Sequence, residues 1–230
     1  MIFITGTDTG CGKTTVGRAI CAALAARGVS VGVFKPAETG CEEVGGNRVP
    51  ADAVALAEAA RSDLPIETIC PYRLRMPASP ERAATDEGLV IDRDVIVDAW
   101  STVRRAADFA IAEGAGGLLV PIAPGLIMAD LPSLLDLPVL VVARDALGTV
   151  NHSLLTIEAI QARRLDLVGI VFSSPEPGPS ALENAHAVAA HSGARLLGTL
   201  PFLCDPDDAT LARSAEENLD LDHLLERCGR

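Results

Sequence analysis

A glycine-rich segment near the start of the chain joins a short β-type run to a helical pattern. The run is Ile2–Thr5, the segment is Gly6-Thr7-Asp8-Thr9-Gly10-Cys11-Gly12-Lys13-Thr14-Thr15, and Val16, Ile20 and Leu24 then recur at helical spacing. A loop in this position can surround phosphate oxygens with its backbone N–H groups, and the helix N-terminus adds its positive dipole. The segment therefore predicts a phosphate-binding loop (P-loop) and, with it, an α/β fold.

The Gly-Lys-Thr-Thr sequence within this segment indicates two side-chain roles. Lys13 would reach the outer phosphates of a nucleotide, and Thr14 would hold Mg²⁺ through its hydroxyl. In the strict motif the first Gly precedes the second by five residues. Here position 7 is Thr and Gly6 is six residues before Gly12, so the loop is a longer variant. The alternative is a glycine-rich turn that only caps the helix.

A dinucleotide-binding fingerprint is another interpretation of these glycines, and two features argue against it. No glycine follows Gly12 by three residues, and the next β-type run ends at Lys35, where an acidic ribose ligand would be expected. We therefore do not expect a dehydrogenase.

β-type runs alternate with helical patterns along the rest of the chain. We expect further strands at residues 29–34, 109–112, 138–143, 167–172 and 195–199, and helices at 51–61, 151–163, 179–191 and after the cap Asp92. Residues 40–50 and 62–90, where Gly and Pro are frequent, are expected to be loops. This alternation predicts a parallel sheet with helices on both faces. Because we find no repeat and no linker, we expect residues 1–230 to form a single P-loop α/β domain.

Composition narrows the range of partners and compartments. The 19 basic and 31 acidic residues give a net charge of −12, which is a poor match to nucleic acid or to an anionic membrane. No apolar run reaches the roughly 18 residues needed to span a bilayer, and no signal peptide is evident. The 6 cysteines show neither C-x-x-C pairing nor metal-finger spacing and are expected to be reduced. We therefore expect a cytoplasmic protein.

Lysine is rare in this chain: the 19 basic residues are 17 arginines and 2 lysines, Lys13 and Lys35. Where arginine serves for almost every surface cation, a lysine is a candidate for a role that needs a compact ammonium group. Ligands of open α/β sheets bind outside the carboxyl ends of the strands, so Lys35 should face the same crevice as Lys13. There it could stabilise a transferring phosphoryl group or an anionic co-substrate. The alternative is a solvated lysine at a strand end.

Two carboxylates are candidate Mg²⁺ ligands, since nucleotide-bound Mg²⁺ takes one or two carboxylates together with phosphates and water. Glu113 ends a buried run and is followed by Gly114-Ala115-Gly116-Gly117, where the glycines permit a ligand to approach the backbone closely. Asp52 opens a helix, and an ordinary N-terminal helix charge is an equally good explanation for it. Another helix start, near Thr149, could bind a substrate carboxylate, although every helix has such an end.

Taken together, these segments resemble the dethiobiotin synthase family of ATP-dependent cyclo-ligases. The resemblance runs in order over nearly the whole chain, through the P-loop, Lys35-Pro36…Thr39-Gly40, Asp52-Ala53, Pro71-Tyr72, Ser79-Pro80, Glu113–Gly117, Leu147-Gly148…Asn151-His152 and Leu200-Pro201…Leu203. It implies a parallel sheet of about seven strands flanked by helices, and a homodimer with the substrate site near the subunit interface. It also implies a reaction in which CO₂ adds to one amine of 7,8-diaminopelargonic acid to give a carbamate. ATP phosphorylates the carbamate to a mixed anhydride, and the second amine closes the ureido ring of dethiobiotin.

The resemblance also implies a role for each matched residue. The Mg²⁺ ligands would be Thr14, Asp52 and Glu113. Lys35 would hold the carbamate and the γ-phosphate beside Thr39 and Gly116, and Lys13 would contact the phosphates. The other nucleotide contacts would come from Thr9, Gly10, Cys11, Gly12, Thr15, Ser173, Pro201 and Leu203. Backbone N–H groups of Thr149, Val150 and Asn151 in the partner subunit would bind the substrate carboxylate.

The chain departs from the family at one nucleotide-binding position. Ser173 stands where the family often carries a base-reading Asn, and a hydroxyl makes fewer directional contacts than an amide, so we expect weaker selection for adenine. The rival prediction is a regulatory ATPase of the ParA/MinD type. The signature lysine of that type would occupy position 8, where this chain has Asp8.

Overall fold

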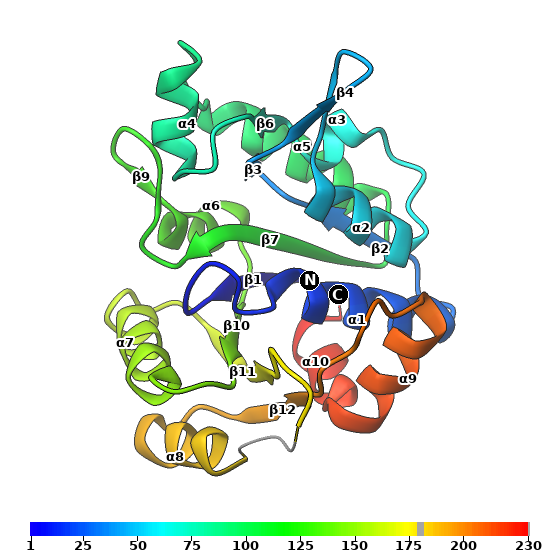
Figure 1. Ribbon diagram of the computed structural model, residues 1–230, viewed down its shortest axis with the longest axis vertical. Helices are drawn as coiled ribbons and strands as arrows, with labels where there is room; N and C mark the ends of the chain where they lie inside the picture. Colours follow the sequence, from blue (N-terminus) through cyan, green and yellow to red (C-terminus); the bar gives the residue numbers. More distant parts are fainter. Residues whose placement is uncertain (179–181, 230) are drawn as a thin grey trace.

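A six-stranded parallel sheet lies at the centre of the structure (Figure 1). The structure is a computed structural model, and it describes residues 1–178 and 182–229. The strand order is β12-β11-β10-β1-β7-β2, with parallel pairing throughout. The strands are β1 (Ile2–Gly6), β2 (Val31–Phe34), β7 (Phe109–Gly117), β10 (Val139–Arg144), β11 (Leu167–Ser173) and β12 (Leu196–Leu200).

Helices cover both faces of this sheet because successive strand residues point to opposite sides and are apolar on both. In β1, Ile2 and Ile4 belong to one apolar cluster, whereas Phe3 between them belongs to another. One helical layer consists of α1 (Lys13–Ala26), α2 (Ala51–Ala60), α9 (Asp208–Asn218) and α10 (Leu221–Cys228). The other consists of α5 (Arg93–Arg105), α6 (Leu131–Leu135), α7 (Thr149–Ala162) and α8 (Leu182–Ser192). The predicted fold class is confirmed.

The strand count differs from the expectation of about seven. After β12 the chain forms α9 and α10, and it returns to the sheet only through an isolated bridge between Gly198 and Leu219. The short strands β3 (Ala37–Thr39) and β6 (Tyr72–Leu74) pair with each other in a separate sheet. The central sheet of the described residues therefore has six strands.

The two segments expected to be loops contain short regular elements. Residues 40–50 form a hairpin of β4 (Glu42–Val44) and β5 (Asn47–Val49). Residues 62–90 include α3 (Ile66–Ile69), β6 and α4 (Pro80–Asp86). Proline is well accepted at the start of a helix, and Pro65 directly precedes α3 while Pro80 is the first residue of α4. The prolines thus mark helix starts here, and the loop expectation was wrong for these residues.

The remaining elements agree closely with the sequence pattern. Helix α5 follows Asp92, whose carboxylate accepts a hydrogen bond from the backbone N–H of Asp94. A small hairpin of β8 (Pro121–Ala123) and β9 (Leu126–Ile127), followed by a 3₁₀ turn at Met128–Asp130, connects β7 to α6. The helix expected at 179–191 is α8, and residues 179–181 lie outside the described part. Among the described residues, no helix has the length and apolar character needed to cross a bilayer. That residues 1–230 form a single domain stays a prediction.

Candidate functional site

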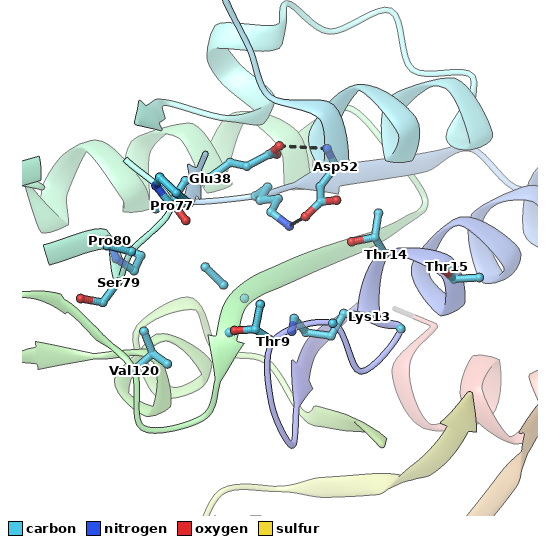
Figure 2. A pocket seen from close by; sticks show the side chains of 18 residues that line it. Thr9, Lys13, Thr14, Thr15, Glu38, Asp52, Pro77, Ser79, Pro80 and Val120 are labelled. Atoms are coloured by element: carbon cyan, nitrogen blue, oxygen red, sulfur yellow. Dashed lines mark hydrogen bonds and ion pairs between the residues drawn. The ribbon is translucent and has the colours of Figure 1, made fainter. Parts of the chain in front are cut away.

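A cavity of about 570 Å³ lies beyond the carboxyl ends of β1, β2 and β7 (Figure 2). Three parts of the chain form its walls. The P-loop side contributes Thr9, Gly10, Gly12, Lys13, Thr14 and Thr15; the β2–α2 side contributes Lys35, Glu38, Thr39 and Asp52; the remaining wall consists of Pro77, Ala78, Ser79, Pro80, Gly114, Ala115, Gly116 and Val120. The two lysines singled out by the sequence therefore line the same cavity.

The P-loop presents an uncapped helix end to this cavity. Gly10 and Gly12 have φ values of 70° and 96°, in the left-handed region that favours glycine. Gly12 is the N-cap of α1, and among the described residues there is no side-chain hydrogen bond that caps this helix end. The free N–H groups and the helix dipole make this end suited to bind phosphate.

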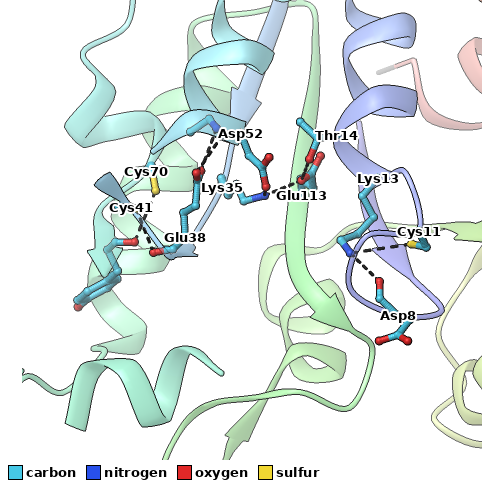
Figure 3. Close-up of polar contacts among 12 residues, drawn as sticks. Asp8, Cys11, Lys13, Thr14, Lys35, Glu38, Cys41, Asp52, Cys70 and Glu113 are labelled. Carbon is cyan, nitrogen blue, oxygen red and sulfur yellow. Dashed lines mark hydrogen bonds and ion pairs between the residues drawn. The ribbon is translucent and has the colours of Figure 1, made fainter. Parts of the chain in front are cut away.

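Lys13 is held within its own loop. Its ammonium donates a hydrogen bond to the carbonyl oxygen of Asp8 at 3.0 Å and lies 4.0 Å from the sulfur of Cys11 (Figure 3). The carboxylate of Asp8 accepts from the backbone N–H of Thr9 at 2.7 Å, so it stabilises the turn. This leaves Lys13 as a cation at the phosphate-binding end of the cavity.

Lys35 lies between two carboxylates on the opposite side. Its Nζ is 2.6 Å from Glu113 Oε1 and 2.5 Å from Asp52 Oδ2, and Thr14 Oγ1 donates to the same Glu113 oxygen at 2.8 Å (Figure 3). Lys35 is 3% exposed and Glu113 is fully buried. Burial opposes the charge on Lys35, but Glu113 and Asp52 outweigh it and raise the pKa of this lysine above its usual value. Lys35 is therefore a buried ammonium at neutral pH.

The oxygens around Lys35 also fit a divalent cation. The Thr14 hydroxyl and the Asp52 and Glu113 carboxylates are oxygen donors, the ligand type that Mg²⁺ prefers. Glu113 is fully buried and is not among the cavity-lining residues, and its Oε2 has no hydrogen-bond partner among the residues that the structure describes. In the part of the chain that the structure describes, no three His, Cys, Asp or Glu residues gather to form a metal site. The donor set therefore suits Mg²⁺ that arrives with nucleotide phosphates.

Glu38 is a cavity residue that the sequence analysis did not identify as part of the site. It is 6% exposed, and its carboxylate accepts hydrogen bonds from the backbone N–H groups of Asp52 at 2.9 Å and Ala53 at 3.0 Å. Burial raises the pKa of Glu38, and the charge of Lys35 opposes this shift. A signal was present in the sequence: Pro50, the residue before α2, has no side-chain acceptor to cap that helix.

Some predicted site residues lie outside the cavity lining. Cys11 is buried with its sulfur 3.3 Å from the carbonyl oxygen of Val142, and Ser173 stands at the end of β11 beside Gly12. Pro201 and Leu203 follow β12. None of these four is among the lining residues, although they belong to segments that the resemblance assigns to the nucleotide.

Thr149, Val150 and Asn151 also lie outside this cavity, in the first turn of α7. A second hollow of about 410 Å³ lies along that helix and is lined by Asp8, Leu119, Val120, His152 and Leu155, among others. Val120 belongs to both cavities, so the two are adjacent. Leu119 and Leu155, which line this hollow, are more than half exposed.

Together, the strand–loop–helix arrangement, the lysine in the loop and the oxygen ligands at the neighbouring strand end define a nucleotide-binding α/β protein of the P-loop NTPase class. Comparisons with known proteins agree. A family model described as "AAA domain" matches residues 1–210. The MinC:MinD cell division protein complex of Aquifex aeolicus has a similar fold, with a TM-score of 0.52 at 17% identity over 93% of this chain and 85% of that one. At that identity the likeness shows the fold alone.

Curated relatives give the particular family. The ATP-dependent dethiobiotin synthetase BioD of Anaeromyxobacter dehalogenans (strain 2CP-C) is 43% identical, covering 93% of this chain and 94% of the relative. The protein of the same name from Thermodesulfovibrio yellowstonii is 33% identical, covering 97% of both chains. The chain belongs to the dethiobiotin synthetase family, whose members are ATP-dependent ligases that form a carbon–nitrogen bond in biotin synthesis.

Proposed function

We propose that this protein carboxylates 7,8-diaminopelargonic acid with CO₂ and closes the ureido ring of dethiobiotin at the expense of ATP, with Mg²⁺ as a cofactor. The observation that carries the proposal is the convergence of both lysines and of Thr14, Asp52 and Thr39 on one cavity, in a chain 43% identical to a dethiobiotin synthetase. In this reaction a carbamate formed from one amine attacks the γ-phosphorus of ATP and displaces ADP, which gives a carbamic–phosphoric mixed anhydride. The second amine then attacks the mixed anhydride, phosphate leaves, and the ring closes.

The main barrier is the repulsion between two anions, a carbamate and a triphosphate. In our proposal the P-loop N–H groups and Lys13 bind the phosphates. Lys35 neutralises the carbamate and the γ-phosphate, and its hydrogen bonds to Asp52 and Glu113 fix the ammonium in place. Pairing these charges in a cavity aligns the reacting atoms and requires no Cys or His nucleophile.

Mg²⁺ would be bound by Thr14, Asp52 and Glu113, and it would supply further positive charge to the phosphates. Thr39 and Gly116 line the same cavity and would lie beside the substrate. Ser173, the last residue of β11, and Pro201 and Leu203, which follow β12, would approach the base. Contacts to the phosphates would come from Thr9, Gly10, Cys11, Gly12 and Thr15.

The substrate carboxylate would bind to the backbone N–H groups of Thr149, Val150 and Asn151 from a second copy of the chain. Two features support a homodimer that uses this face: the hollow along α7 with its exposed Leu119 and Leu155, and the exposed Leu147 just before that helix. Leu147 precedes the first turn of α7, so a partner that covers it would also reach that helix end. We further propose a cytoplasmic location and no nucleic-acid or membrane partner, in keeping with the net charge of −12.

The proposed reaction is tested by phosphate release and by detection of dethiobiotin. We expect Mg²⁺-dependent phosphate release only when bicarbonate and the diamine are both present. Replacement of Lys35 by Ala should lower turnover about 10³-fold, because the charge on the transferring group loses its stabilisation, while binding of an ATP analogue persists. Equal ATP hydrolysis without the diamine would instead favour a regulatory ATPase.

A further inference from the structure

Helix α2 carries Asp52 but has no capping side chain of its own. The N-cap position is Pro50, and no side-chain hydrogen bond is made from it. The first N–H groups of a helix need acceptors, since no residue of the preceding turn is available to them. A helix end this close to a cavity therefore depends on a partner from elsewhere in the chain.

Glu38, on β3, is that partner. Its Oε1 accepts from Asp52 N–H at 2.9 Å and its Oε2 accepts from Ala53 N–H at 3.0 Å. Both oxygens of the carboxylate are thus used on the helix end, where a negative charge also complements the helix dipole. Glu38 also lines the cavity, but the contacts that the structure shows for its carboxylate are the two to the helix end.

Asp52 is consequently held at two points by one short segment of the chain. Glu38 binds its backbone N–H, and Lys35 binds its carboxylate at 2.5 Å. The Asp52 side chain is 46% exposed, so these contacts, rather than surrounding packing, determine where its free oxygen points. Groups that orient metal ligands in this way commonly contribute 10- to 100-fold to metal affinity.

We propose that Glu38 is a positioning residue, which caps α2 and thereby holds the Asp52 carboxylate in place for the divalent cation of the nucleotide complex. The proposal rests on the proposed function in one respect, the metal role of Asp52. It goes beyond that function because it assigns a purpose to Glu38, which was not among the expected site residues.

The test measures Mn²⁺ affinity directly, by the EPR signal of free Mn²⁺, with the β,γ-imido analogue of ATP bound. Glu38→Ala should weaken Mn²⁺ binding about 10-fold or more, in the range measured for such orienting groups. Glu38→Gln retains one acceptor oxygen, so its affinity should lie between those of the wild type and Glu38→Ala. If Glu38→Ala fails to fold, the glutamine variant alone decides, because unchanged affinity in it would overturn the proposal.

Asp92→Ala is the matched control for the loss of a helix cap. Asp92 caps α5 by accepting a 2.8 Å hydrogen bond from Asp94 N–H, and none of the cavity-lining residues belongs to α5. This variant should lower the melting temperature as Glu38→Ala does, but leave Mn²⁺ affinity unchanged. Equal loss of affinity in both variants would mean that Glu38 only stabilises the fold, and would overturn the proposal.

Measurements in an Asp52→Ala background separate the role proposed for Glu38 from the metal role proposed for Asp52. If Glu38 acts through Asp52, adding Glu38→Ala to Asp52→Ala should produce no further loss of Mn²⁺ affinity. If Asp52→Ala lowers Mn²⁺ affinity but Glu38→Ala does not, the proposal for Glu38 is overturned and the metal role of Asp52 stands. Wild-type affinity in Asp52→Ala would overturn the metal role of Asp52, and with it the role proposed for Glu38.

Discussion

The two lysines of this chain lie on the same cavity but are held in opposite ways. On the P-loop side, the Lys13 ammonium bonds to a carbonyl five residues away in its own loop. On the other side, Lys35 bonds to carboxylates 17 and 78 residues away, on α2 and β7. The first arrangement is local, and a ligand can replace its contacts without leaving a buried charge unpaired. The second connects three elements, so Lys35 contributes to the folded core as well as to the proposed chemistry.

The largest effect should follow from Lys13→Met. Methionine fills a similar volume but cannot bind phosphate, so turnover should fall at least about 10³-fold, which corresponds to ~4 kcal/mol of transition-state stabilisation. The unfolding free energy should fall by about 1 kcal/mol, because the lost hydrogen bond is to an uncharged carbonyl within the loop and leaves no carboxylate unpaired. Phosphate-release rates and urea unfolding measure the two quantities. Turnover within tenfold of the wild type would contradict the phosphate role of Lys13.

Lys35→Met should differ from Lys13→Met in stability. Without the ammonium, Glu113 remains a fully buried carboxylate whose remaining hydrogen bond comes from Thr14. Breaking a buried pair from one side costs about 3 kcal/mol, which urea unfolding would resolve clearly. Adding Glu113→Gln should restore part of the loss, since the unpaired charge disappears. Equal unfolding free energies for Lys13→Met and Lys35→Met would contradict the idea that Lys35, unlike Lys13, helps to hold the folded core together.

The P-loop side of the cavity was easier to predict from the sequence than the side that holds Lys35. The P-loop occupies one continuous segment, so the strand before it, the helix after it and the cationic role of Lys13 could all be inferred from adjacent residues. Glu113 and Asp52 could be proposed only as separate candidates, because nothing in the sequence states that β7 lies next to β1 or that α2 begins beside β3. Lys35 was expected at the crevice, but its two ion pairs arise from the strand order.

The cavity residues that could not be predicted from the sequence also depend on contacts between distant segments. Glu38 acts on a helix that begins thirteen residues later, so the pattern around Glu38 itself does not identify it. Pro77 and Ser79 reach the cavity because β6 pairs with β3, a contact between two three-residue strands that leave almost no periodic signal. Short elements and distant contacts are decided by tertiary packing, which a single sequence does not display.

Two glycine variants test how the P-loop packs against the neighbouring strand β11. Gly10 and Gly12 both have positive φ, so alanine at either position should cost about 1 kcal/mol of stability. A Cβ at Gly10 would meet nothing within 4 Å, whereas a Cβ at Gly12 would lie 2.7 Å from the Cβ of Ser173. Gly12→Ala should therefore cost about 2 kcal/mol in total because the side chains overlap. Adding Ser173→Gly to Gly12→Ala should recover the extra loss of unfolding free energy that Gly12→Ala shows compared with Gly10→Ala. Equal unfolding free energies for the two single glycine variants would contradict the contact with β11.

The smallest effect concerns the nucleobase, through the same Ser173. This residue is buried beside Gly12, and its short hydroxyl offers few directional contacts to a base. We expect kcat/KM for ATP, GTP and CTP to agree within about fivefold, a difference of ~1 kcal/mol, when dethiobiotin formation is measured with each. Ser173→Ala should change these ratios less than about twofold, because the hydroxyl contributes little to the choice. A preference for ATP above about 100-fold would require base contacts from other residues, and the segment around Pro201 and Leu203, which follows the adjacent strand β12, would be the first place to look for them.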